Sequence, residues 1–231
     1  MCGMALTQDG KPFFQWLGED STGERVRRFK GAMSFVGSGA GRASVTGPLA
    51  GFDWHGLGNV KVIDVDGSTG HISSTLARAC PDLVFVVQDL PEVVRDLKAP
   101  EDLTGRMTFE AYDFMKQEQP ITDGDVYFFR KVFHDWSDED STTIIQNTLE
   151  AMKEGARLIV NEHIVPDPGE LNAGIDEKTM RALDLQMMMC LNARERSLEE
   201  WRSLFEGASG GRLKFEGARR GVMSFLLCSG E

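Results

Sequence analysis

The stretch "KVIDVDGSTGHI", residues 61–72, decides how this sequence is interpreted. It runs from an apolar strand pattern through a turn of small residues into a helical pattern. That order is typical of the start of a nucleotide-cofactor site, because the helix N-terminus offers free N–H groups. Asp66 stands at the turn, where glycine would adopt the required backbone conformation more easily. The turn therefore has three interpretations: a working cofactor site, a damaged one, or an ordinary structural turn.

Strand and helix patterns alternate outward from this turn. Strand patterns cover residues 60–65, 83–90, 107–114, 125–133 and 156–165, and helical patterns cover residues 71–80, 91–97, 137–155, 176–192 and 197–205. Two closing strands, 212–220 and 222–229, are expected to form a hairpin around Gly221. This alternation predicts an α/β fold with a mostly parallel sheet, helices on both faces and an antiparallel C-terminal pair. In such sheets ligands bind at the carboxyl ends of the strands.

Helix boundaries are marked by capping residues. Ser137 is expected to cap one helix, with Lys153 in its last turn and Gly155 ending it. Ser197 and Glu200 have the spacing of a capping box at the start of another helix.

We expect a lead-in over residues 1–59 and a cofactor-binding domain over residues 60–231. The lead-in has helical and loop character, with a helix beginning at Ser21 or Thr22. Residues 37–51 are rich in glycine and are expected to form a surface connection.

Composition excludes several kinds of partner. The 231 residues carry a net charge of −11, which disfavours nucleic acid and anionic membranes as partners. The N-terminus lacks the pattern of a secretory signal, so we expect a cytoplasmic protein. The four cysteines are scattered and match no zinc spacing, so reduced thiols are expected.

The second strand contributes a candidate ribose ligand. Asp89 lies about 20 residues after the turn, where an acid commonly binds ribose hydroxyls. Ser73 replaces the third glycine of the dinucleotide motif, and the acid at position 66 would repel a pyrophosphate. A cationic cofactor without phosphates, such as S-adenosylmethionine, fits this turn better, although a purely structural turn remains open.

Three further strand ends carry polar side chains. Asp113 and Phe114 follow the third strand, and they are either an adenine-binding pair or a loop acid and a core aromatic. His134 follows the fourth strand and is a candidate base, because the pKa of histidine lies near neutrality. Glu162 at the end of the fifth strand is expected beside His134, with Glu195 as a third candidate. An isolated histidine is more often structural than catalytic, and Glu195 can equally be a surface ion-pair residue.

An acidic cluster after His134 has two interpretations. Asp135, Asp138, Glu139 and Asp140 are either metal ligands or, as we expect, acids that complement the helix dipole. No metal site is predicted.

Six segments occur in an order and at distances typical of one family. They are "IDVDGSTG", "QDLPEVV", "YDF", "FFRKVFHDWSDED", "LIVNEHIVPD" and "DLQMMMCLNARERSLEEW". The chain resembles the caffeic-acid-type plant and fungal small-molecule O-methyltransferases that use S-adenosylmethionine, and it looks closest to fungal secondary-metabolite members. The resemblance covers nearly the whole chain and implies a Rossmann-like class I methyltransferase fold with a seven-stranded sheet.

The resemblance also implies roles for individual residues. The general base and its flanking acids are His134, Glu162 and Glu195. The cofactor-binding residues are Asp66, Gly67, Gly70, Asp89, Asp113, Phe114 and Arg130. The acceptor pocket is lined by Trp136, Met187 and Met188, although a methionine-rich helix face is equally consistent with simple burial. The implied acceptor is an aromatic small molecule with a hydroxyl group.

Two departures from the family bear on activity. Asp66 occupies the first glycine of the family's turn. Family members also carry a helical N-terminal domain that mediates dimerisation, whereas this chain begins where the catalytic domain begins. We therefore do not expect the usual family dimer, and the oligomeric state is left open.

The sequence supports one main function and two rivals. The first is transfer of a methyl group from S-adenosylmethionine to a phenolic or polyketide-like hydroxyl. The second is a non-catalytic or impaired member that binds cofactor or a partner protein. The third, a nicotinamide oxidoreductase, is disfavoured by the turn pattern.

Overall fold

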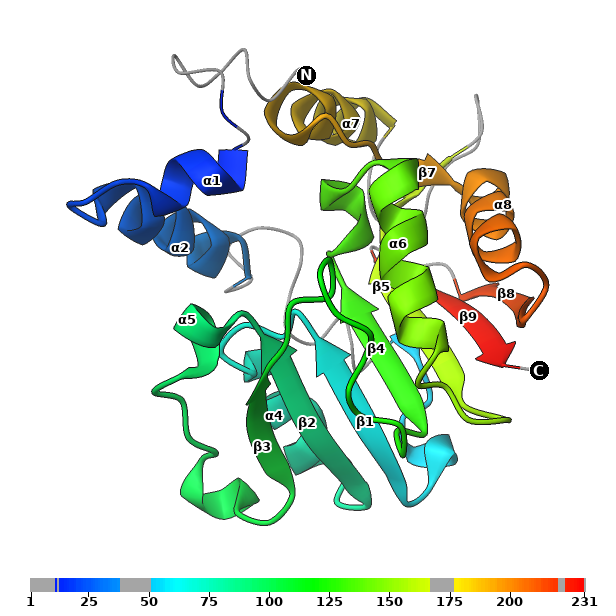
Figure 1. The fold of residues 1–231 in the computed structure, drawn as a ribbon. Coiled ribbons are helices and arrows are strands. Elements are labelled where there is room, and N and C mark those ends of the chain that lie inside the picture. Colours follow the sequence, from blue (N-terminus) through cyan, green and yellow to red (C-terminus); the bar gives the residue numbers. More distant parts are fainter. Residues whose placement is uncertain (1–10, 12, 38–50, 167–176, 220–222, 231) are drawn as a thin grey trace.

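The fold is a twisted sheet with helices on both faces (Figure 1). The computed structural model describes residues 11, 13–37, 51–166, 177–219 and 223–230. The strands are β1 (Val60–Val65), β2 (Leu83–Asp89), β3 (Met107–Ala111), β4 (Val126–Arg130), β5 (Arg157–Glu162), β6 (Ile164–Val165), β7 (Arg196–Ser197), β8 (Leu213–Arg219) and β9 (Ser224–Gly230). The α-helices are α1 (Phe13–Gly18), α2 (Glu24–Gly37), α4 (His71–Ala79), α5 (Pro91–Val94), α6 (Asp138–Leu149), α7 (Glu177–Leu191) and α8 (Leu198–Ser209). Short 3₁₀ turns are η2 (His55–Leu57), η3 (Glu101–Leu103) and η4 (Phe133–Asp135).

Seven strands form the main sheet in the order β3-β2-β1-β4-β5-β9-β8. Strands β1 to β5 are parallel, while β9 runs antiparallel to β5 and β8 antiparallel to β9. The predicted parallel sheet with an antiparallel closing pair is therefore confirmed. Strands β6 and β7 form a separate two-stranded parallel sheet, which the sequence analysis did not predict.

The central strands are apolar on both sides because both faces of the sheet are covered. Along β4, Tyr127 and Phe129 belong to one core cluster, while Val126 and Phe128 belong to the other. Such continuous apolar runs are typical of parallel strands buried between helices.

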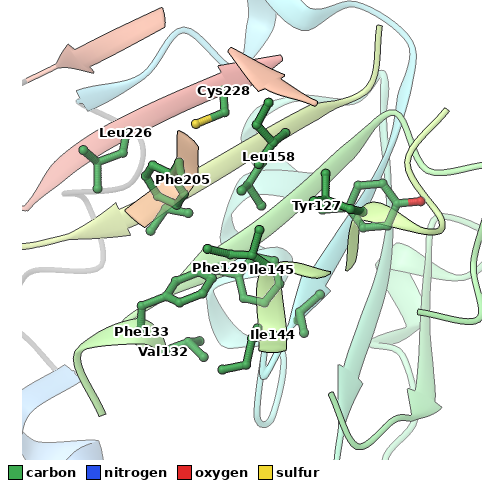
Figure 2. Close-up of a cluster of buried hydrophobic side chains, with 14 of the residues drawn as sticks. Tyr127, Phe129, Val132, Phe133, Ile144, Ile145, Leu158, Phe205, Leu226 and Cys228 are labelled. Atoms are coloured by element: carbon green, nitrogen blue, oxygen red, sulfur yellow. The ribbon is translucent and has the colours of Figure 1, made fainter. Parts of the chain in front are cut away.

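The two cores lie on opposite faces of the sheet. Phe133, Ile144, Ile145 and Phe205, from η4, α6 and α8, pack on one face (Figure 2). On the other face, α4 packs together with the segment that contains Trp54. Each fully buried aromatic or aliphatic side chain stabilises the fold by about 1.5–3 kcal/mol.

Several predicted element boundaries are wrong. Helix α6 ends at Leu149 and not at Gly155, because the N–H groups of Ala151 and Met152 bond to carbonyls three residues back and close the helix in tight turns. Lys153 lies outside the helix and pairs with Asp125 at 2.6 Å.

Strands β3 and β4 are shorter than predicted. Strand β3 ends at Ala111. Strand β4 ends at Arg130, because Lys131 has a left-handed backbone with φ of 56° and turns the chain into η4. This break releases His134 from the strand.

The predicted caps are confirmed. Ser137 accepts a hydrogen bond from the N–H of Asp140, and Ser197 forms a capping box with Glu200. The expected turn at Gly221 and most of the glycine-rich segment 37–51 lie outside the described residues.

The described part of the lead-in forms α1 and α2, which contact each other. The rings of Phe13 and Phe29 are 5.6 Å apart, and the Arg25 guanidinium lies 4.0 Å from the Trp16 ring centre. Figure 1 draws these helices and α7 beyond the carboxyl ends of the strands. Among the described residues, no helix is both long and apolar enough to cross a membrane.

The strand order reverses between β1 and β4, which are neighbours in the sheet. Ligands of open α/β sheets bind outside the carboxyl ends of the strands at such a reversal. The polar residues at the ends of β1, β2, β4 and β5 therefore converge on one edge.

Candidate active site

The turn after β1 is tied to the end of β2. Val65 pairs with Gln88, so Asp66 and Asp89 follow at neighbouring strand ends. The Gly67 N–H donates to the carbonyl of Gln88 at 3.0 Å, and the Ser68 N–H donates to the carboxylate of Asp89 at 2.9 Å. These bonds hold the turn beside the acid predicted to bind ribose.

Packing explains why both glycines of the turn are needed. A Cβ at Gly67 would lie 2.6 Å from Val87, and one at Gly70 would lie 2.3 Å from Met107. Gly70 also has a left-handed φ of 70° at the N-cap of α4. Both glycines therefore satisfy a structural requirement, and their contact with a cofactor stays a prediction.

Asp66 and Asp89 form a carboxyl pair at this edge. Desolvation, then the negative charges of Asp89 and Asp135, raise the pKa of Asp66 well above its usual range. Because the side chain of Asp66 is open to solvent, we attribute most of this shift to the neighbouring acids. Desolvation also raises the pKa of Asp89, against the hydrogen bonds that it accepts from Leu90 and Ser68. The pair favours a shared proton or a nearby positive charge.

Arg130 brings a cation to the end of β4. Its Nε is buried and has no hydrogen-bond partner among the described residues. Burial lowers the pKa of its guanidinium, opposed by the charges of Asp64 and Glu162. Burial likewise raises the pKa of Asp64 to about 6, although the Ser73 hydroxyl donates to its carboxylate. Arg130 is therefore a half-buried cation whose buried Nε is available to a ligand.

The segment that carries His134 is fixed from two sides. The Val132 N–H donates to Glu162 at 2.8 Å. Arg196 is fully buried and donates to the carbonyls of Phe133 at 2.8 Å and Trp136 at 2.9 Å. These bonds set the position of η4 and hence of the imidazole.

His134 lies among acids, as predicted for a base. Its Nδ1 is 3.1 Å from Glu195 Oε1, and its Nε2 is 3.5 Å from Asp135 Oδ1. Burial alone lowers the pKa of His134, but the charge of Glu162 and the hydrogen bond to Glu195 outweigh it, with Asp135 adding to them, and raise the pKa to about 10. His134 is thus a strong base within a negative cluster.

The pKa values of the two glutamates are shifted in opposite directions. Desolvation raises the pKa of Glu162 above its usual range. For Glu195, the hydrogen bonds and charges of His134 and His163 overcome desolvation and lower the pKa to about 2. Glu195 is 4% exposed, so it is a partner of His134 and not the surface ion-pair residue that the sequence also allowed. The neighbouring Arg194 forms the surface ion pairs instead.

The other predicted residues lie in local contacts. Asp113 pairs with Lys116 at 2.7 Å, and the Phe114 ring packs edge-on against Trp136 with centroids 5.7 Å apart. Met187 is buried at 9% exposure, whereas Met188 is 45% exposed. Their adenine-binding and acceptor-binding roles stay predictions.

The acids at the start of α6 serve the helix and its neighbours. Asp138 binds the side chains of Arg194 and Arg196. Within the described ranges, no cluster of three or more His, Cys, Asp or Glu side chains has an arrangement that could hold a metal ion.

Sequence reasoning missed three residues at this edge. Lys131, His163 and Arg196 all lie near the segments that carry His134 and Glu195, yet none has a motif of its own. Arg196 and His163 reach the site through the β6–β7 pairing, and two-residue strands leave no periodicity to detect.

Together, the strand order, the turn after β1 and the His134–Glu195 pair are those of a Rossmann-like methyltransferase domain. A family model described as the O-methyltransferase domain matches residues 33–210, and the chain belongs to this family.

Curated relatives and solved structures agree with this assignment. The O-methyltransferase aoiF of Aspergillus oryzae is 41% identical over 201 residues, which cover 84% of this chain and 46% of that protein. The grayanic acid biosynthesis cluster O-methyltransferase of Cladonia grayi is 39% identical over 226 residues, covering 92% of this chain and 48% of that protein. The chain spans about half the length of these curated relatives.

Two solved structures share the fold. TnmH matches with a TM-score of 0.77 and 28% identity, covering 96% of this chain and 62% of that one. NcsB1, an O-methyltransferase from neocarzinostatin biosynthesis, matches with a TM-score of 0.75 and 25% identity, covering 97% of this chain and 62% of that one. The NcsB1 structure contains S-adenosylmethionine and 2-hydroxy-5-methyl naphthoic acid. The fold and family that the sequence resemblance implied are confirmed.

Proposed function

We propose that this chain transfers a methyl group from S-adenosylmethionine to a hydroxyl of a phenolic or polyketide-like small molecule, with His134 as the general base. The observation that carries the proposal is the hydrogen bond between the half-buried His134 and the buried Glu195 at the edge where the strand order reverses. A histidine in this setting is suited to removing a proton from a bound hydroxyl.

The described residues fit the cofactor. S-adenosylmethionine supplies, when bound, a methyl group on a positively charged sulfur. Arg130 has a buried, unpartnered N–H that suits a carboxylate. Asp89 accepts two backbone hydrogen bonds, which leaves lone pairs for ribose hydroxyls. The acids around His134 favour a positive charge nearby.

The acids around His134 raise its pKa above the usual range of histidine, to about 10. A phenol titrates near pH 10, so a base is needed to remove its proton at neutral pH. Glu195 holds the Nδ1 proton, so Nε2 is the nitrogen that takes the proton of the acceptor. Because the acids favour the protonated form of His134, we expect methyl transfer to rise as the pH increases above 7.

The proposed class of acceptor is inferred from a structural relative. NcsB1 was solved with a hydroxynaphthoic acid, and aromatic hydroxyls of this kind are our first candidates. Trp136, Met187 and Met188 are proposed to line the acceptor side. The alternative, a non-catalytic family member, is not favoured, because the curated relatives described above are named O-methyltransferases.

Transfer of a labelled methyl group to a panel of naphthols and hydroxynaphthoic acids tests the proposal. We expect His134→Gln to reduce the rate by at least about 100-fold, with affinity for S-adenosylhomocysteine unchanged. His55→Gln, at an exposed histidine in η2, is the matched control and should retain activity. Full activity in His134→Gln would remove His134 from the role of base.

A further inference from the structure

Two histidines face one carboxylate in this site. Glu195 Oε1 lies 3.1 Å from His134 Nδ1 and 3.6 Å from His163 Nδ1. The side chain of Glu195 is 1% exposed and that of His163 is 7% exposed. The methyl-transfer chemistry above uses His134 and Glu195 but gives His163 no role.

Backbone pairing places His163 beside Glu195. In the β6–β7 sheet, Ile164 pairs with Arg196. His163 and Glu195 directly precede these two residues, so the pairing holds them next to each other. The carbonyl of His163 also accepts a hydrogen bond from the buried Trp201 indole at 3.3 Å. The position of His163 is therefore set by the fold and does not depend on a side-chain rotamer alone.

Hydrogen-bonding rules determine what His163 offers to Glu195. A carboxylate only accepts hydrogen bonds, and the pKa of Glu195, lowered to about 2, keeps it ionised. An unprotonated Nδ1 would turn its lone pair toward this negative charge. His163 Nδ1 is buried and has no other hydrogen-bond partner among the described residues. In the favourable arrangement the proton is on Nδ1 of His163. A small rotation of the ring would shorten the distance from Nδ1 to Glu195 Oε1 from 3.6 Å to hydrogen-bond distance.

We propose that His163 is a positioning residue that donates its Nδ1–H to Glu195 and holds this carboxylate against Nδ1 of His134. This inference rests on the proposed function. A second donor fixes the carboxylate, which in turn fixes the ring orientation and tautomer of the base. His163 thus leaves Nε2 of His134 directed at the acceptor without touching the acceptor itself.

Two substitutions separate hydrogen bonding from packing. In His163→Asn the amide nitrogen takes the place of Nδ1, so the donor is kept. In His163→Leu the volume is similar but the donor is lost. We expect His163→Leu to lower kcat about tenfold with little change in KM, because a misplaced base costs rate and not binding. We expect His163→Asn to stay within about threefold of the unchanged chain. Equal losses in both variants, or no loss in His163→Leu, would overturn the inference.

Nitrogen-15 spectra of the histidine rings give a readout that needs no turnover. We expect the His163 ring to carry a proton on Nδ1 in the unchanged chain and to lose that preference in Glu195→Gln. An unprotonated Nδ1 beside an intact Glu195 would overturn the inference even if methyl transfer is found. Conversely, a chain that methylates no acceptor but shows the Nδ1 proton would contradict the proposed function and leave the role of His163 supported.

Discussion

Asp66 is the residue at which this chain departs most from the family turn. It adopts a left-handed backbone with φ of 63°, and Ser68 does the same with φ of 53°. Each such residue costs of the order of 1 kcal/mol. Asp66 also lies beside Asp89, so its charge adds repulsion to the backbone strain. The turn is therefore held in place by its surroundings, including the Ser68–Asp89 hydrogen bond.

Replacing Asp66 should stabilise the fold. Asp66→Gly relieves the strain, and we expect a gain of about 1 kcal/mol in urea unfolding. Asparagine tolerates the left-handed backbone at this position, so Asp66→Asn removes only the charge. The raised pKa means that the folded state binds this proton more tightly than the unfolded state. The gain from Asp66→Asn should therefore be present at pH 8 and fade as the pH falls toward 4. A gain that does not change with pH would contradict the charge argument.

The sequence predicted the members of the site better than their contacts. His134, Glu162 and Asp89 follow strand ends, so topology alone predicted them at one edge. Glu195 had two open interpretations, because flanking arginines are typical of surface ion pairs. The structure supports the interpretation of Glu195 as a buried residue, because β7 pairs with β6 and places Glu195 beside His134. Three-dimensional pairing of this kind leaves no local signal in the sequence.

At the scale of elements, α4 depends on its N-cap glycine. Gly70 and Gly155 both have left-handed backbones, with φ of 70° and 77°, but only Gly70 has side chains in the path of a Cβ. We expect Gly155→Ala to cost about 1–2 kcal/mol. Gly70→Ala should cost about 1–3 kcal/mol more, because Met107 and Phe109 must move. Equal losses of unfolding free energy would show that packing at α4 plays no part.

Strand β7 fixes η4, the turn that carries His134, through Arg196. Arg196→Met would remove the guanidinium donors from the carbonyls of Phe133 and Trp136, of which, within the described part of the chain, only Phe133 keeps a backbone donor, the N–H of Trp136. We expect a loss of about 3 kcal/mol in unfolding free energy and lower methyl transfer. Arg194→Met is the control, because that side chain is 44% exposed and forms only surface ion pairs, and it should cost less than about 1 kcal/mol. Similar losses in the two variants would contradict the special role of Arg196.

Elements with strong patterns were predictable and short ones were not. The double-sided apolar run of β4 and the capping box of α8 were read correctly because each follows a local rule. The end of α6 was wrong, since Lys153 and Gly155 are typical of a helix end but here serve the loop before β5. Strands β6 and β7 are too short for any periodicity.

For the whole molecule, the net charge and the strand topology favour the same kind of ligand. The net charge is −11, and acids from four strand ends gather where the strand order reverses. Arg130 is a half-buried cation among them. Such an edge disfavours a pyrophosphate and favours a ligand that combines a positive centre with a carboxylate. The same charge distribution favours binding of a methyl-transfer cofactor over binding of a nicotinamide dinucleotide.

Calorimetric titration of the chain with S-adenosylmethionine, S-adenosylhomocysteine and NAD tests this account most directly. We predict that both methyl-transfer cofactors bind, that NAD does not, and that Asp66→Gly tightens binding of S-adenosylmethionine. Absence of binding by both S-adenosyl compounds, or tighter binding of NAD, would contradict the account.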